Sequence, residues 1–193
     1  MRNASWIRGD VAHPTDEARS DLAIASFVLG ELPLEERDEA IARWFDLTED
    51  ELVVVEPGSV GGFEVIRAAR DRLIATGGTI SAPCPHDGMC PMTEGDWCHF
   101  GIRVPRSRLQ RGITSGDRGF EDEKFSYVAA SKRDVAERWP RVVRRPRQHG
   151  GHVRLDLCAK PGLVEIVVAR SDRDRYRRSR KVEWGDAFGE AVP

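Results

Sequence analysis

The sequence predicts an α/β fold, and three observations support this prediction. Apolar runs typical of buried strands alternate with helical periodicity over residues 21–82, a pattern typical of a parallel sheet with right-handed crossovers. Residues 83–100 lack both periods and concentrate Pro, Gly, Cys and His. Beyond residue 100, short strand patterns follow one another in an arginine-rich segment. We therefore divide the chain into a sheet-forming part (1–82), a cysteine-rich loop (83–100) and a basic, β-rich part (101–193) that completes the sheet and the cysteine site.

The individual elements follow from local periodicity. Residues 21–29 (DLAIASFVL) and 51–56 (ELVVVE) are nearly continuous apolar runs, which predict strands buried on both faces. Apolar residues at helical spacing predict helices from Leu34 to Phe45 and from Gly62 to Ala75. Further strands are expected at 79–82, 124–130, 151–158 and 163–170, the last two as a hairpin, and a basic helix is expected at 173–181.

Charge is distributed unevenly along the chain. The net charge is −2, but residues 1–100 carry 8 Lys and Arg against 19 Asp and Glu, whereas residues 101–193 carry 22 against 13. A basic half indicates an anionic partner, with RNA the first candidate, and a solvated basic face is the alternative. No apolar run is long enough to span a bilayer, and residues 1–10 do not resemble a secretory signal. We therefore expect no membrane association and a cytoplasmic protein.

The four cysteines form the clearest functional pattern. Cys84, Cys90 and Cys98 follow a C-x5-C-x7-C spacing within a polar, proline-punctuated loop, and Cys158 follows with 59 residues between. Free cysteines ordinarily scatter through apolar elements, and disulfides are rare in a reducing compartment. Thiolates bind zinc and iron–sulfur clusters, whose bonds can replace the missing hydrophobic core of such a loop. The pattern therefore predicts one site for a metal or a cluster.

Spacing alone leaves the identity of that metal open. Zinc sites usually show paired C-x2–4-C knuckles, and this chain has none. The wider spacing, with Pro85 and Pro91 directly after two cysteines, favours a four-cysteine iron–sulfur cluster. His86 and His99 lie in the same loop and keep a zinc site possible, although a polar loop residue or an outer-shell donor is the simpler interpretation of each.

Several longer motifs resemble a known family. They are SFVLGEL (26–32), VVVEPGSVGGFEVIRAARDRL (53–73), APCPHDGMCP (82–91), DWCHF (96–100), EDEKFSYV (121–128) and WGD (184–186). In this order they resemble the methyltransferase-like family associated with the mitochondrial small ribosomal subunit, together with its bacterial relatives. The resemblance covers residues 21–186 and is carried above all by the unusual CPHDGMC and EDEKFSY segments.

The resemblance implies a fold, cofactors and a partner. The fold would be the C-terminal half of a Rossmann-like sheet of an S-adenosylmethionine-dependent methyltransferase. The cofactor would be an iron–sulfur cluster, 4Fe-4S in type, on the four cysteines. The partner would be the small ribosomal subunit, in whose assembly or translation the chain would bind rRNA phosphates. The residues expected to make these contacts are Arg141, Arg144, Arg145, Arg147, Arg175, Arg177, Arg178, Arg180 and Lys181.

The chain also departs from the family. No strand is followed by the glycine-rich loop that binds the cofactor, because GSVGG (58–62) has a different spacing and corresponds to a later turn, at the cleft edge. The first strand corresponds to the family's fourth. A late reading frame, a split gene with a separate N-terminal half, and a degenerate relic are alternative explanations. We therefore expect these residues alone to bind S-adenosylmethionine poorly and to lack activity.

Residues near the cofactor are assigned from the resemblance, and no catalytic residue is assigned. Asp21, Ser26, Glu31 and Glu56 are expected near strand ends beside a cleft, with Gly58 in the adjoining turn. A helix cap or turn partner is the alternative for each. Two other functions stay open: an active methyltransferase once an N-terminal segment completes the site, and a zinc-stapled structural module with no role in RNA binding.

Overall fold

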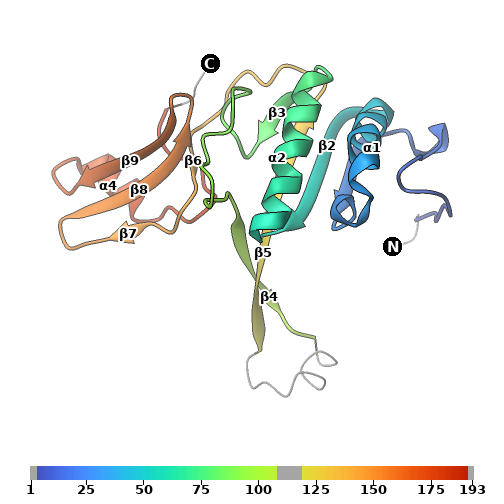
Figure 1. Cartoon of the computed structure of the whole chain (residues 1–193). Coiled ribbons are helices and arrows are strands. Elements are labelled where there is room, and N and C mark those ends of the chain that lie inside the picture. Colours follow the sequence, from blue (N-terminus) through green and yellow to red (C-terminus); the bar gives the residue numbers. More distant parts are fainter. Residues whose placement is uncertain (1–3, 108–118, 191–193) are drawn as a thin grey trace.

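The structure, a computed structural model, describes residues 4–107 and 119–190. It contains two sheets, and the cysteine-rich loop lies between them (Figure 1). The first sheet has strands β1 (Ser20–Ser26), β2 (Thr48–Pro57), β3 (Thr79–Ala82), β4 (Phe100–Pro105) and β5 (Phe120–Ser131). The second has β6 (Arg141–Val142), β7 (Arg147–Gln148), β8 (His152–Ala159) and β9 (Gly162–Ala169). The helices are α1 (Leu34–Leu47), α2 (Val60–Ala75) and α4 (Arg173–Ser179), with short 3-10 turns η1 (Asp16–Ala18) and η2 (Leu29–Glu31).

The order of the first sheet is β1-β2-β5-β3, and β4 pairs with β5. β1 and β2 are parallel, as predicted. β5 is antiparallel to both β2 and β3, so it lies between two strands that the sequence predicted as members of a purely parallel sheet. The α/β prediction is confirmed, and the sheet is compatible with part of a Rossmann-like fold, but its pairing is mixed.

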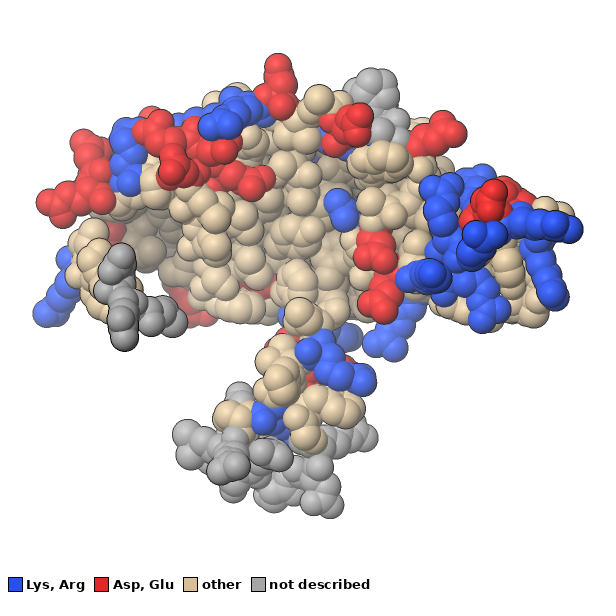
Figure 2. Space-filling model, turned by 180° about the vertical axis from the view of Figure 1, so that it is seen from behind, with Lys and Arg blue, Asp and Glu red and all other residues tan. Residues whose placement is uncertain are grey.

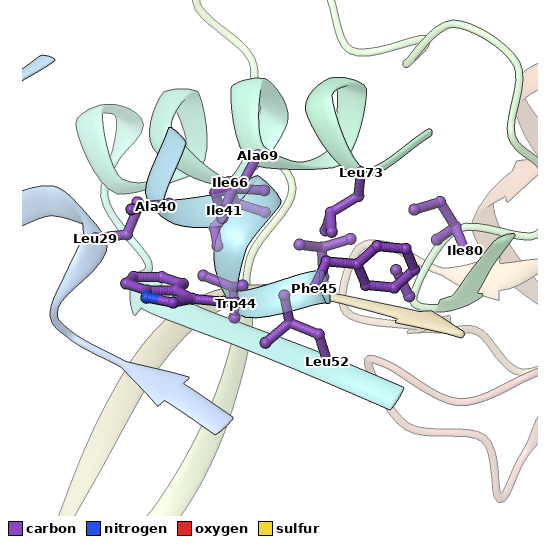
Figure 3. Close-up of a cluster of buried hydrophobic side chains, with 13 residues drawn as sticks. Leu29, Ala40, Ile41, Trp44, Phe45, Leu52, Ile66, Ala69, Leu73 and Ile80 are labelled. Carbon is purple, nitrogen blue, oxygen red and sulfur yellow. The ribbon is translucent and has the colours of Figure 1, made fainter. Parts of the chain in front are cut away.

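Helices α1 and α2 cover one face of this sheet (Figure 1). Figure 3 shows the core between them, where Leu52 of β2 and Ile80 of β3 meet side chains of both helices. Leu73 of α2 and Leu52 are fully buried, and Ile41 of α1 nearly so. Burial of large aliphatic side chains of this kind contributes roughly 1.5–3 kcal/mol each. The amphipathic pattern of the two helices therefore places the core where the sequence predicted it.

The second face of the sheet differs from the prediction. Leu22 and Ile24 of β1 are 51% and 64% exposed, and their neighbour Val53 of β2 is only half-buried. The expectation that these strands are buried on both faces was therefore wrong. In the described part of the chain, both α1 and α2 lie on the other face, so the strands alternate between buried and open side chains despite their continuous apolar sequence.

The second sheet is built around β8. β9 pairs with β8 as the predicted hairpin, and Gly162 takes a φ of +121° where the chain reverses, a conformation that favours glycine. β6 and β7 pair with other parts of β8. Val153 and Leu155 are fully buried, and Phe188 packs in the same cluster. α4 packs against this hairpin and is shorter than the predicted basic helix at 173–181.

β4 and the first part of β5 form a two-stranded arm that projects away from the rest of the molecule (Figures 1 and 2). Arg103 pairs with Asp122, and Arg106 with Glu121, across the arm. The sequence did not predict β4 because its FGIRVP segment is short and mostly exposed. A search of the helices in the described ranges finds none with the length and hydropathy needed to cross a bilayer.

Gly58 provides a test of how β2 is joined to β5. A Cβ atom at this position would lie 2.7 Å from the backbone of both Lys124 and Phe125, so Gly58→Ala should lower the free energy of unfolding by about 1–3 kcal/mol. Gly61→Ala is the matched control, because nothing lies within 4 Å of a Cβ there and alanine favours the helix by about 0.5–1 kcal/mol. Urea denaturation of both variants measures the difference, and equal stability would contradict the close approach.

Candidate functional site

All four cysteines line one pocket between α2 and the second sheet. Cys84 follows β3, Cys90 and Cys98 belong to the loop that leads to β4, and Cys158 lies near the end of β8. Cys158 is buried, the other three are half-buried, and none of the four is in a disulfide. Residues nearly seventy-five positions apart thus meet at one place, as the sequence predicted. Within residues 4–107 and 119–190, however, no three His, Cys, Asp or Glu side chains form a group that could hold a single metal ion.

The walls of the pocket are mainly apolar. Phe63 and Ile66 come from α2, Met92 from the loop, and Val128 from β5. Phe63, Met92 and Cys158 also belong to one buried cluster with Val143. This cluster joins the first sheet to the second through the loop, so the pocket lies at the junction between the two halves of the molecule.

Side-chain hydrogen bonds organise the loop, which has no regular secondary structure. Asp87 accepts a hydrogen bond from the backbone N–H of Ile80 at 2.8 Å and pairs with Arg138 at 2.6 Å. Trp97 Nε1 donates to the Gly58 carbonyl at 3.1 Å, and Ser126 Oγ donates to the Cys98 carbonyl at 2.8 Å. These contacts attach the loop to β2, β3 and β5, and thereby place three of the cysteines.

Arg70 is the charged residue most deeply placed beside the cysteines. It lies on α2, is 3% exposed and lines the same pocket. Burial of the Arg70 guanidinium lowers its pKa, but the charge and hydrogen bonding of Cys84, followed by Cys90 and Asp71, outweigh this effect and raise it. Arg70 therefore stabilises negative charge on the neighbouring sulfur atoms.

Burial raises the pKa of the thiols of Cys84, Cys98 and Cys158. The pKa of Cys158 rises to about 12, and that of Cys98 also rises well above its ordinary value, with further contributions from neighbouring cysteines. Burial also raises the pKa of Cys84, and Arg70 opposes that shift. Thiols in this environment keep their protons at neutral pH unless a positive centre replaces them, which is what a bound metal does to its thiolate ligands.

The two loop histidines occupy different surroundings. His99 stacks on Trp97 with ring centroids 5.0 Å apart and meets the edge of Trp184 at 4.7 Å. His86 is buried, and neither of its ring nitrogens has a hydrogen-bond partner in the described part of the chain. Neither histidine lines the cysteine pocket, so the arrangement groups the four cysteines without them.

The residues assigned to a methyltransferase cofactor are not all brought together. β1 and β2 are parallel, so Ser26 and Glu56 lie at the same edge of the sheet. Glu56 is buried and accepts a hydrogen bond from the Gly30 N–H at 3.1 Å, beside Glu31. Asp21 lies near the beginning of β1, at the opposite edge. Glu56 thus contacts the η2 turn, which is the kind of contact that the turn-partner alternative describes.

Two further features at the edge of the sheet beside Ser26 and Glu56 concern the residues assigned to the cofactor. Gly58 donates its N–H to the Lys124 carbonyl at 3.0 Å and is packed against the β5 backbone, so β5 covers one side of it. Phe27, directly after β1, has a φ of +55° and is 55% exposed. A non-glycine residue in this conformation is strained and is found more often at functional sites, and no sequence pattern predicted this conformation.

The predicted RNA-contacting arginines divide into two groups. Arg141 donates to the carbonyls of Pro83 and Gly185, Arg144 pairs with Asp96, and Arg147 pairs with Asp156 and Glu165. These three therefore have structural partners within the chain. The second group consists of Arg145, Arg175, Arg177, Arg178, Arg180 and Lys181, which are all exposed, and Arg147 of the first group is exposed as well.

The exposed basic residues gather over the second sheet and α4. Figure 2 shows Lys and Arg concentrated at that end of the molecule, whereas Asp and Glu predominate over the opposite upper end. Arg177 pairs with Asp174 across one turn of α4, and Arg175 lies over the Phe188 ring at 5.9 Å. The charge asymmetry of the sequence is therefore also an asymmetry in space.

Sequence reasoning missed Arg70, although a signal for it was present. It stands seven residues after Phe63 and four after Ile66, which places an arginine on the apolar side of α2. A charged residue at such a position is rarely fully buried without a partner. Met92 and Ser126 were also missed, and nothing in their local sequence distinguishes them.

Comparisons with known proteins agree with the resemblance found in the sequence. A family model described as mitochondrial small ribosomal subunit Rsm22 matches residues 1–189. The human ribosome assembly protein METTL17, mitochondrial, is 31% identical over 190 residues, which cover 90% of this chain and 40% of the human protein. The Rsm22-cox11 tandem protein 2, mitochondrial, of Schizosaccharomyces pombe is 29% identical over 215 aligned positions, covering 86% of this chain and 29% of that protein.

A shorter match is to the ribosome assembly protein RSM22, mitochondrial, of Saccharomyces cerevisiae, which is 38% identical over 61 residues, or 31% of this chain and 10% of that protein. The chain thus spans at most 40% of the length of these relatives. All of them are mitochondrial, which contradicts the expectation of a cytoplasmic protein. That expectation rested on the lack of a secretory signal, and mitochondrial addresses have a different, amphipathic and arginine-rich character.

Proposed function

Because the chain belongs to the mitochondrial small ribosomal subunit Rsm22 family, a methyltransferase-like ribosome assembly family, we propose that it acts in small-subunit assembly as an iron–sulfur protein that binds rRNA. The observation that carries this proposal is the convergence of all four cysteines on one pocket at the junction of the two sheets. The names of the relatives supply the process, and the pocket and the basic surface supply the chemistry.

The residues around the pocket fit a thiolate-bound cluster. Cys84, Cys90, Cys98 and Cys158 would hold it, the apolar wall would exclude water, and Arg70 would face its negative charge. A bound cluster would supply coordination bonds that fasten the irregular loop to β8. Because the loop and β8 belong to different halves of the chain, these bonds would set the position of the basic sheet relative to the first sheet.

A single zinc ion is the second candidate for the same four cysteines. Tetrahedral zinc with Zn–S bonds of about 2.3 Å places its ligand sulfurs about 3.8 Å apart. In the described residues, no three potential ligands form such a group. A cluster binds each cysteine through a different iron atom, so its ligand sulfurs stand further apart. The observation that favours the cluster is the wide cysteine spacing in the sequence, which lacks the paired knuckles of a zinc site.

The exposed basic surface supports RNA binding. Arg145 and the basic residues of α4 point to solvent on the end of the molecule where positive charge gathers (Figure 2). Phosphate contacts of this kind give affinity and position without reading base sequence. Arg141, Arg144 and Arg147 would act indirectly, because their contacts with the loop and with β8 hold the surface in shape.

Methyl transfer after completion of the sheet is the alternative function. β1 is the last strand of its sheet in the described residues, and a groove of about 340 Å³, lined by Ala23, Ile24 and Val28 among others, runs beside it. An N-terminal half, on the same or a separate polypeptide, would pair there and supply the cofactor loop, and the relatives are long enough to contain one. Ser26, Glu31, Glu56 and Gly58 would then adjoin S-adenosylmethionine.

Cofactor binding separates the two functions. If the proposed function is right, equilibrium dialysis of these 193 residues against labelled S-adenosylmethionine should show no binding at micromolar concentration, because no strand in this sequence is followed by a glycine-rich loop whose backbone could approach the cofactor. Saturable binding at that concentration, lost in Glu56→Gln, would instead support a cofactor site at the carboxyl ends of β1 and β2.

The cysteine site predicts a specific metal content. Protein purified without oxygen should contain iron and acid-labile sulfide in matched amounts, and Cys84→Ser or Cys158→Ser should lose most of both and several °C or more of thermal stability. Met89→Ser is the matched control, because Met89 lies in the same loop but is 91% exposed and does not line the pocket. Stoichiometric zinc in a colourless protein would support the zinc-stapled alternative.

The basic surface predicts a salt-dependent affinity for RNA. Arg145→Gln and Arg178→Gln should each weaken binding to small-subunit rRNA fragments several-fold at low salt and reduce the slope of log affinity against log salt by roughly 0.7–0.9 per lost phosphate contact. Arg43→Gln, which removes an arginine from the acidic end paired with Asp16 and Asp46, is the control. Equal slopes in all three variants would indicate that the basic face is merely solvated.

A further inference from the structure

Arg70 has surroundings that its role in the fold does not explain. Its side chain is 4% exposed and lies on the same side of α2 as Phe63 and Ile66, facing the cysteine pocket. A buried guanidinium is costly unless negative charge and hydrogen-bond acceptors surround it. The surroundings of Arg70 therefore indicate what the pocket is built to contain.

The available partners leave the charge of Arg70 incompletely compensated. Its NH2 group donates to the carbonyls of His86 at 2.9 Å and Gly88 at 2.6 Å, and its NH1 group lies 3.2 Å from Asp71. Asp71 is 65% exposed, so water screens much of this ion pair. The Nε atom is fully buried and has no acceptor within the described ranges. Neutral carbonyls and one screened carboxylate thus face a buried cation.

A four-cysteine site with a metal or cluster bound would supply the negative charge that the other partners of Arg70 do not provide. Four thiolates carry −4, and either a 2+ cluster core or one Zn²⁺ carries +2, so the site has a net charge of −2 in both cases. Arg67, the other cation that lines the pocket, pairs with Glu64 at 2.5 Å and is partly exposed. Of the two arginines that line the pocket, Arg70 is therefore the more deeply buried.

We propose that Arg70 is the built-in counter-charge of the four-cysteine site, and that it sets how strongly the site holds a metal centre and how readily that centre accepts an electron. The inference rests on the proposed metal site. Its statement about metal affinity holds for a cluster or for zinc, whereas its statement about electron acceptance applies to a cluster, because Zn²⁺ has no redox chemistry. The same guanidinium joins the Cys84–Cys90 segment to α2 through the two carbonyls, so charge and position act through one side chain. Arg70 is a positioning residue, because it acts on the ligands.

Three variants separate the charge of Arg70 from its hydrogen bonds. Arg70→Gln removes the charge and keeps a donor, whereas Arg70→Lys keeps the charge and loses the forked geometry. Arg72→Gln is the matched control on the same helix, because Arg72 donates to the Asp38 carbonyl and does not line the pocket. Each variant is prepared without oxygen as the full chain, and its iron, sulfide and zinc are measured first.

The main readout is a reductive titration with dithionite followed by electron paramagnetic resonance. One-electron reduction changes the net charge of a four-cysteine cluster from −2 to −3, so loss of a nearby cation disfavours the reduced form. We expect reduction to become at least tenfold less favourable in Arg70→Gln, a fall in midpoint potential of about 59 mV. Arg70→Lys should recover most of the shift, and Arg72→Gln should match the unaltered chain.

Other outcomes decide the inference in defined ways. If the unaltered chain binds zinc, competition with a chelator replaces the titration, and Arg70→Gln should release zinc at least tenfold more readily than Arg70→Lys. Equal potentials or affinities in the unaltered chain and Arg70→Gln would overturn the inference. Equal loss of metal from Arg70→Gln and Arg70→Lys would overturn it as well, because Arg70 would then act only as a clamp on the loop. A chain that binds neither metal would contradict the proposed function itself.

Discussion

β5 is the strand on which the arrangement of the molecule depends. It pairs with β2, β3 and β4. It is therefore an interior strand that holds the first sheet together, and its first part belongs to the projecting arm. Through Ser126 it also holds the Cys98 carbonyl, and its backbone approaches Gly58 at the turn into α2. The chain leaves β5 to enter the second sheet. One set of backbone hydrogen bonds therefore fixes the helical layer, the cysteine loop and the start of the basic half relative to one another.

The loop between β3 and β4 shows how a segment without regular structure can still be specified. Side chains satisfy backbone carbonyls of the loop: Ser126 donates to that of Cys98, and Arg70 to those of His86 and Gly88. In the other direction, the loop side chains of Asp87 and Trp97 bond the backbone of Ile80 and Gly58. These hydrogen bonds place cysteines from the loop opposite Cys158 of β8. On the proposed function, coordination bonds would complete the same task, and the junction between the sheets would depend on both.

The arginines of this chain fall into two classes: those that contact other parts of the chain and those that are exposed to solvent. Arg70, Arg141, Arg144 and Arg147 contact carbonyls or carboxylates and hold elements together, whereas those of α4 are mostly exposed. The guanidinium group suits both tasks, because its planar donors can join several acceptors and its charge stays fixed at any physiological pH. A count of basic residues therefore overestimates the surface available to a nucleic acid.

Sequence patterns alone located most helices and strands, identified the family and marked the cysteines of the loop as candidate ligands. Each of these depends on local periodicity or on motifs such as CPHDGMC, which a short window contains. Tertiary packing was needed to place β5 between β2 and β3, to leave Leu22 and Ile24 exposed, and to bring Cys158 and Arg70 to the cysteines of the loop. Strand pairing, exposure of a sheet face and burial of a charge depend on segments distant in the chain, and no local pattern of residues encodes them.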